Sequence, residues 1–149
     1  MKALIVYDSV YGNTEKIARA IGDAIAGEVE VHRAGEVNVS ELDAFDLIVV
    51  GSPTHGGRPT PAVRGFIDEA PASALKGVNV AAFDTRSPAK WARIFGFAAG
   101  RIGDSLKRKG GKLVVPPEPF FVEGTEGPLK EGELERATGW AEDIVKSIE

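Results

Sequence analysis

The chain has 149 residues, of which 43% are apolar and 27% charged, and it contains no cysteine. This balance is typical of one globular domain spanning residues 1–149 and excludes an intrinsically disordered chain. The absence of cysteine excludes disulfides, thiolate metal sites and a cysteine nucleophile. A formal net charge of −4 argues against a nucleic-acid partner, and no apolar run approaches the ~20 residues that span a membrane. We therefore expect a cytoplasmic protein with neither kind of partner.

The first half of the chain alternates strand and helix patterns. Residues 2–7 form an apolar run that suits a strand covered on both faces. Apolar residues then recur at helical spacing from about Asn13 to Ala26. Residues 28–33 alternate valine with polar residues, as a less buried strand would. A short helical turn fits near residues 40–42, before a third strand at 47–51.

The second half continues the alternation. Thr60 and Pro61 are suited to the N-cap and the first position of a helix that reaches Ala70. A fourth strand is expected at 78–83, followed by a helix from 98 that stops at the glycines 110–111. The fifth strand begins at 113–115, is interrupted at 116–119 and resumes at 120–122, and a last helix covers 134–148.

This order of elements predicts an α/β fold with three layers, in which a five-stranded parallel sheet has helices on both faces. Ligands of such sheets bind outside the carboxyl ends of the strands, near the point where the strand order reverses. The loops after strands one, three and four are therefore the places to look for a site.

The loop after the first strand has the composition of an anion site. It runs from Asp8 to Glu15 and contains two hydroxyls, an amide and a glycine at a helix N-terminus. Free backbone N–H groups and the helix dipole attract anions at that position. The loop has no lysine and no GxxxxGK[ST] spacing, which disfavours a P-loop NTPase. An ordinary helix cap and a phosphate-binding loop remain equally open interpretations.

The other two loops are also unusual. Residues 51–61 are dense in turn formers and contain a pair of glycines that permits close approach to a flat ligand, although a rigid turn explains the same residues. Residues 84–88 place polar groups directly after an apolar strand, and Arg86 is either a ligand contact or a surface charge. His55 alone is weak evidence for function.

Together these loops resemble those of the flavodoxin family. The phosphate loop of that family is matched by Ser9-Val10-Tyr11-Gly12-Asn13-Thr14, and its Gly-Ser-Pro-Thr segment by Gly51-Ser52-Pro53-Thr54. The resemblance covers essentially the whole chain. It implies a flavodoxin-like fold with strand order 2-1-3-4-5 and non-covalently bound FMN.

The resemblance also implies roles for individual residues. The phosphate would be bound by the loop Ser9, Val10, Tyr11, Gly12, Asn13 and Thr14. One side of the isoalloxazine ring would be lined by Pro53, Thr54, His55, Gly56 and Gly57. The other side and the pyrimidine edge would be approached by Asp84, Thr85 and Arg86. In the family a glycine carbonyl reorients when the flavin is reduced, and Gly56 and Gly57 are the candidates.

The sequence departs from typical flavodoxins in three ways. The second loop offers His55 where a ring-stacking tryptophan is frequent. The third loop lacks the usual tyrosine, for which Trp91, Phe95 or Phe97 could substitute, although core packing is expected for at least two of them. The flavin loops contain Arg58 and Arg86 where the family is usually acidic. Positive charge beside the flavin would make the semiquinone/hydroquinone potential less negative.

Two functions follow from the resemblance. The first is an electron carrier that shuttles electrons between redox partner proteins through the semiquinone and hydroquinone states, as a monomer or weak homodimer. The basic stretch from Arg86 to Lys112 could dock an acidic partner, with Arg86, Lys90 and Arg93 nearest the flavin end, although a solvated helix face explains these three residues equally well. The second is an NAD(P)H-dependent quinone or flavin reductase. A receiver-like signalling domain is set aside because the third strand does not end in an aspartate.

Overall fold

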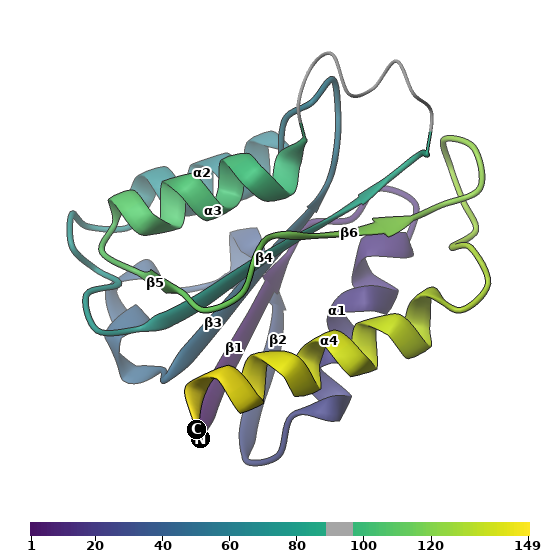
Figure 1. The fold of residues 1–149 in the computed structure, drawn as a ribbon. Coiled ribbons are helices and arrows are strands. Elements are labelled where there is room, and N and C mark those ends of the chain that lie inside the picture. Colours follow the sequence, from purple (N-terminus) through teal and green to yellow (C-terminus); the bar gives the residue numbers. More distant parts are fainter. Residues whose placement is uncertain (89–96) are drawn as a thin grey trace.

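The computed structural model describes residues 1–88 and 97–149 of the chain, and its centre is a parallel sheet (Figure 1). The strands lie in the order β2-β1-β3-β4-β5, with β6 also paired to β4. This order confirms the predicted three-layer α/β fold and the 2-1-3-4-5 arrangement. The strands are β1 (Lys2–Tyr7), β2 (Glu28–Arg33), β3 (Leu47–Pro53), β4 (Asn79–Arg86), β5 (Lys112–Leu113) and β6 (Glu118–Phe121).

The fifth position of the sheet is shared by two short strands. β5 pairs with the start of β4 and β6 with its end, so the chain leaves the edge of the sheet between residues 114 and 117 and then returns to it. The predicted interruption is confirmed, but its place is wrong by two residues, because β6 begins at Glu118 and contains Pro119. An edge strand tolerates a proline because one side of its backbone has no strand to pair with.

The helices match the predicted spacing closely. α1 covers Asn13–Ala24 and ends two residues earlier than expected, and α2 covers Pro61–Glu69 with Thr60 at its N-cap, as predicted. The remaining helices are α3 (Ala98–Arg108) and α4 (Glu133–Ile148). Two short 3₁₀ segments, η1 (Ala34–Glu36) and η2 (Val39–Ala44), replace the single turn expected near residue 40.

The sheet separates two apolar cores (Figure 1). α2 and α3 pack on one face, where Leu4 and Val6 of β1 point, and α1 and α4 cover the other face, where Ala3 and Ile5 point. This alternation into two buried layers explains why β1 is apolar along its length. β2 is half exposed at the sheet edge, which agrees with its alternating sequence.

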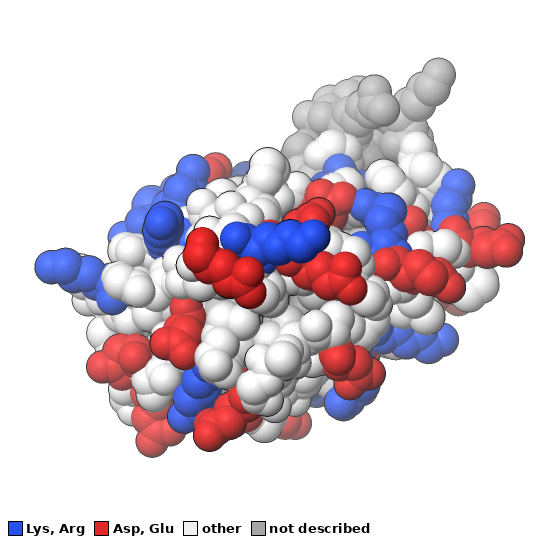
Figure 2. Space-filling model, turned by 60° about the horizontal axis from the view of Figure 1, so that its bottom comes forward, with Lys and Arg blue, Asp and Glu red and all other residues white. Residues whose placement is uncertain are grey.

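The side of the molecule at the bottom of Figure 1, where α1 and α4 lie, has a mixed surface. Basic and acidic groups intermingle on it (Figure 2). Within the described residues, no helix is long and apolar enough to cross a membrane.

Candidate functional site

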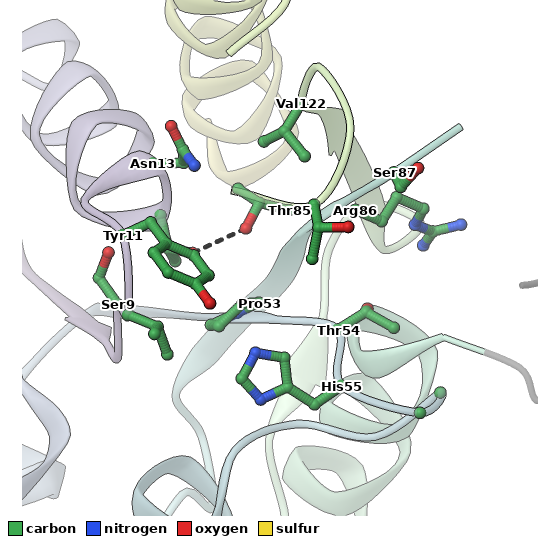
Figure 3. A pocket seen from close by; sticks show the side chains of 15 residues that line it. Ser9, Tyr11, Asn13, Pro53, Thr54, His55, Thr85, Arg86, Ser87 and Val122 are labelled. Carbon is green, nitrogen blue, oxygen red and sulfur yellow. Dashed lines mark hydrogen bonds between the residues drawn. The ribbon is translucent and has the colours of Figure 1, made fainter. Parts of the chain in front are cut away.

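A cavity of about 410 Å³ opens at the carboxyl ends of the strands, where the loops after β1, β3 and β4 meet (Figure 3). Twelve of the fourteen residues predicted for a site line it, which brings together segments far apart in sequence. The other two do not line it: Gly12 is half-buried at the N-cap of α1, and Asp84 is fully buried. The twelve are Ser9, Val10, Tyr11, Asn13, Thr14, Pro53, Thr54, His55, Gly56, Gly57, Thr85 and Arg86.

The first loop wraps around the hydroxyl of Ser9. Its Oγ accepts hydrogen bonds from the backbone N–H of Gly12 at 3.0 Å and, more weakly, from that of Glu15 at 3.4 Å. Gly12 stands at the N-cap of α1 with φ at +94°, a left-handed conformation that favours glycine. Gly12 therefore shapes the loop without contacting the cavity.

Three backbone N–H groups of this loop, on residues that line the cavity, have no acceptor in residues 1–88 and 97–149. No described residue accepts a hydrogen bond from the backbone N–H groups of Tyr11, Asn13 or Thr14, which stand at the start of α1. The hydroxyl of Thr14 is buried and lies 2.8 Å from that of Thr85. Clustered N–H groups at a helix N-terminus, together with these hydroxyls, form a site suited to a phosphate.

The second loop is tied to the third loop and to α3. The N–H of Thr54 donates to the carbonyl of Thr85 at 2.9 Å, and the N–H of Ala98 donates to Thr54 Oγ1 at 3.1 Å. Within the second loop, Ser52 Oγ accepts a hydrogen bond from the N–H of Thr60 at 2.9 Å. Backbone contacts thus fix the spacing between the two loops.

A two-residue turn from His55 to Arg58 forms the mouth of the cavity. The two end residues exchange backbone hydrogen bonds of 2.9 and 3.0 Å, while Gly56 and Gly57 have φ of +55° and +80°. Positive φ at both central positions is the pattern of a type I′ turn, and it explains the pair of glycines. Arg101 of α3 donates from Nε to the carbonyl of Gly57 at 2.9 Å and so anchors the turn from outside.

Asp84 carries a buried ion pair rather than a cavity contact. Its carboxylate is fully buried and accepts from Arg86 Nε at 2.8 Å and Nη2 at 2.7 Å, as well as from the N–H of Ala99 at 2.9 Å. The Arg86 guanidinium lies 3.4 Å from the ring centroid of Phe97. Phe97 therefore packs on Arg86, and Trp91 and Phe95 lie outside the described residues.

The expected effect of the two arginines needs correction. Arg58 is exposed and lines a different cavity, and the charge of Arg86 is matched by that of Asp84. A neutral pair perturbs a redox potential far less than an isolated charge does. The expectation of an unpaired positive charge at Arg86 is therefore wrong, while the effect of Arg58 on the reduction potential stays a prediction.

Among the described residues, Tyr11 and His55 give the cavity its aromatic surface. Tyr11 is 54% exposed, and its ring projects into the cavity on the side opposite His55 (Figure 3). Val10, also 54% exposed, adds apolar surface, and Pro53 lies between the two rings. Exposed apolar groups around a slot next to an anion site suit a planar ring attached to a phosphate.

The sequence interpretation missed the fourth loop of the site, after β6. Val122 and Thr125 line the cavity, as does Ser87 after β4. The amide of Asn13 donates to the carbonyl of Glu126 at 3.0 Å, which joins this loop to the first one. The rule that ligands bind at strand carboxyl ends would have found this loop if it had been applied to the fifth strand.

Glu133 at the start of α4 holds β6 in place. Its carboxylate accepts from the N–H of Phe121 at 2.8 Å and from Arg136 Nη2 at 2.9 Å, and Arg136 also pairs with Glu118. The hydrogen bond from Arg136 lowers the pKa of Glu133, burial opposes this change, and the bond from the backbone of Phe121 adds to it. The charged network thus supports the strand from which the fourth loop leaves.

Comparison with solved structures agrees with this geometry. A structure titled as a flavodoxin from the domain Archaea has a TM-score of 0.82 and 26% identity, with 99% of both chains covered. Oxidised flavodoxin 2 from Bacillus cereus has a TM-score of 0.80 and 29% identity, covering 98% of this chain and 99% of that one.

Sequence relatives give the same picture. A flavodoxin of Picosynechococcus is 30% identical over 106 residues, which is 69% of this chain and 62% of the relative. An NAD(P)H dehydrogenase (quinone) of Cupriavidus metallidurans is 30% identical over 52% of this chain and 50% of its own length. The chain thus spans one half to under two thirds of these relatives. The family model described as flavodoxin matches residues 5–140, so this chain belongs to the flavodoxin family.

Proposed function

We propose that this protein binds FMN in the cavity at the carboxyl edge of the sheet and carries electrons between redox proteins. The observation that carries the proposal is the set of N–H donors at the start of α1 that have no acceptor within the described residues, next to a cavity with apolar walls. The match to the flavodoxin family model and the similarity of the fold to a solved flavodoxin also support the proposal.

The phosphate end of the ligand would be held by the first loop. The N–H groups of Tyr11, Asn13 and Thr14 would donate to it, and the hydroxyl of Thr14 would add a further bond while keeping its contact with Thr85. Ser9 is engaged by Gly12 and would act by shaping the loop. The loop contains no cation, so backbone donors and the dipole of α1 would balance the charge of the phosphate.

The ring would occupy the slot between the mouth turn and the loops after β4 and β6. Pro53, Thr54, His55 and the two glycines would line one side, and Thr85, Arg86 and Ser87 the other. Bound FMN would supply a ring that accepts and returns electrons. The protein would hold this ring near the surface, since His55 and Gly56 are exposed and leave the mouth of the cavity open to a partner.

Titration and stepwise photoreduction test the proposal. FMN should bind with a 1:1 endpoint and lose its fluorescence as purified protein is added, while riboflavin, which lacks the phosphate, should bind far more weakly. Photoreduction followed by absorbance should then proceed in one-electron steps. Equal affinity for FMN and riboflavin would contradict the phosphate site.

A second candidate function is an NAD(P)H-dependent quinone reductase. It is favoured by the relatives named NAD(P)H dehydrogenase (quinone), which match about half of this chain. Rapid oxidation of NADH or NADPH by the FMN-loaded protein with a quinone present would support it. Reduction that needs a separate partner reductase would support the carrier.

A further inference from the structure

A second cavity, of about 350 Å³, lies between α2 and α3 and has an unusual charge. Four arginines line it together with two aspartates, and we call these residues and this cavity the arginine groove. The charged residues are Arg58, Arg64, Arg101, Arg108, Asp68 and Asp104. Two of the arginines, Arg101 and Arg108, belong to the basic stretch from Arg86 to Lys112, whereas Arg58 and Arg64 come from the mouth turn and α2, so no single sequence pattern joins the four.

The charge of the groove is not balanced internally. Within residues 1–88 and 97–149, Arg58, Arg64 and Arg108 form no ion pair. Arg108 bonds to the neutral hydroxyl of Ser105 at 3.0 Å, and Asp104 is engaged by Lys107 at 3.6 Å. The groove therefore carries a net positive charge, although the chain as a whole carries −4.

The groove is continuous with the mouth of the FMN cavity. Arg58 is the last residue of the turn whose glycines line that cavity, and Arg101 donates to the carbonyl of Gly57 in the same turn. A protein seated on the groove would rest against this turn. Electrons would then cross between the two proteins where the ring is nearest the surface.

From these observations we infer that the arginine groove is the docking surface for an acidic redox partner protein. The inference rests on the proposed function and adds the charge of the partner and the place where it binds. Exposed guanidinium groups pair with carboxylates and speed up the encounter between proteins of opposite charge. A transient encounter of this kind suits a carrier that must release each partner after transfer.

The groove differs from the docking surface expected from sequence. Arg86 is paired with Asp84 and only 13% of its side chain is exposed, so it offers little charge to a partner. Lys90 and Arg93 lie outside the described residues. Arg58 and Arg64, by contrast, are exposed.

An NMR titration of the full chain tests the inference without depending on FMN. ¹⁵N-labelled protein is titrated with cytochrome b5, an acidic haem protein, and in parallel with cytochrome c, a basic one. Cytochrome b5 should shift the signals of Arg58, Arg64 and their neighbours, and the apparent affinity should fall about tenfold when KCl is raised from about 20 to about 200 mM. Equal binding of both cytochromes, or shifts confined to other surfaces, would overturn the inference.

Charge reversal supplies the matched control. The double variant Arg58→Glu, Arg64→Glu should weaken the binding of cytochrome b5 about tenfold or more and abolish its salt dependence. The double variant Lys76→Glu, Lys146→Glu makes the same change in net charge at exposed positions near the opposite end of the sheet, and should change binding less than twofold. Similar effects of both variants would mean that the net charge of the protein, and not the position of the groove, governs binding, and would overturn the inference.

Electron transfer separates this inference from the proposed function. In stopped-flow experiments, the reduced, FMN-loaded protein should reduce cytochrome b5 at a rate that falls with salt, and the rate should drop about tenfold in the groove variant. If FMN does not bind, the proposed function fails while the NMR result still decides the groove. If FMN binds and the transfer rates change with neither salt nor charge reversal, only the inference about the groove fails.

Discussion

The floor and the mouth of the cavity proposed for FMN are built in opposite ways. The floor, lined by Thr14 and Thr85 and continued by the buried strand residues Gly51 and Asp84 behind it, is almost completely buried, and its three polar side chains have fixed partners. The mouth turn, residues 55–58, is largely exposed, and a Cβ placed on Gly56 would meet nothing within 4 Å. Among residues 1–88 and 97–149, this turn is held by backbone hydrogen bonds and by Arg101.

This difference indicates that the floor and the mouth have different roles. A buried, fully bonded floor fixes the positions of the donors proposed to bind phosphate and stabilises the domain, because breaking a buried bond leaves an unpaired polar group. In a two-residue turn of glycines, changes in backbone conformation cost little free energy. We therefore expect substitutions in the floor to affect stability and affinity strongly, and substitutions in the mouth turn to affect them weakly.

The largest effect is expected for Asp84→Ala. The change leaves the largely buried Arg86 side chain without its counter-charge and the N–H of Ala99 without its acceptor. Removal of one partner from a buried ion pair costs about 3–5 kcal/mol, which urea unfolding would measure. The matched control is Asp104→Ala, which breaks the exposed pair with Lys107 and should cost under about 1 kcal/mol. Equal losses in the two variants would contradict a structural role for the Asp84 pair.

The next effect is expected for Gly51→Ala. A Cβ at this position would stand 2.0 Å from the ring of Phe83, which is itself enclosed by Phe120 and Trp140 and has no room to move. Overpacking of this kind costs about 1–3 kcal/mol, seen as a lower melting temperature. Gly35→Ala is the control, since a Cβ there meets nothing within 4 Å. A melting temperature unchanged by Gly51→Ala would show that the core yields more than this packing indicates.

A smaller effect, on affinity, is expected for Thr14→Val. The substitution keeps the shape of the side chain, removes a donor to the phosphate and leaves the buried hydroxyl of Thr85 without its partner. Loss of one such bond, at about 1.4 kcal/mol, weakens FMN binding about tenfold in a fluorescence titration. Thr138→Val removes an exposed hydroxyl on α4 and should leave binding unchanged. Unchanged FMN affinity in Thr14→Val would move the phosphate away from this threonine.

The smallest effect is expected for Gly56→Ala in the mouth turn. Space is open, so the only penalty is the left-handed conformation at φ +55°, which costs about 1 kcal/mol for an alanine. Asn tolerates this conformation better, so Gly56→Asn should lose less stability in the same urea experiment. If both variants lost as much as Asp84→Ala, the contrast between floor and mouth would be wrong.

Much of the fold was predictable because local patterns agree with the tertiary structure. Thr60 and Pro61 mark the start of α2, as their capping preferences indicate. The boundaries that were missed depend on distant contacts. β6 begins at Glu118 because β4 offers partners there and Arg136 engages the Glu118 side chain, and nothing in the local run of prolines reports either contact.

For the candidate site, too, features set by local sequence differ from features set by distant contacts. The sequence by itself determined the order of elements, the loops at the carboxyl ends of β1, β3 and β4, and the pair of glycines that a tight turn requires. These features follow from hydrophobic periodicity and backbone preference, which act between near neighbours in the chain.

Only the tertiary structure decided how charge is distributed around the site. Arg86 and Arg58 have equal charges in the sequence, yet Asp84 neutralises the first, while the second joins Arg64, Arg101 and Arg108 in the arginine groove. Ion pairing depends on which side chains packing brings within a few ångströms, and those contacts link residues that are distant in sequence. The positive charge that the sequence predicts next to the proposed flavin site is therefore neutralised at Arg86, and the positive charge of Arg58 belongs to the neighbouring arginine groove.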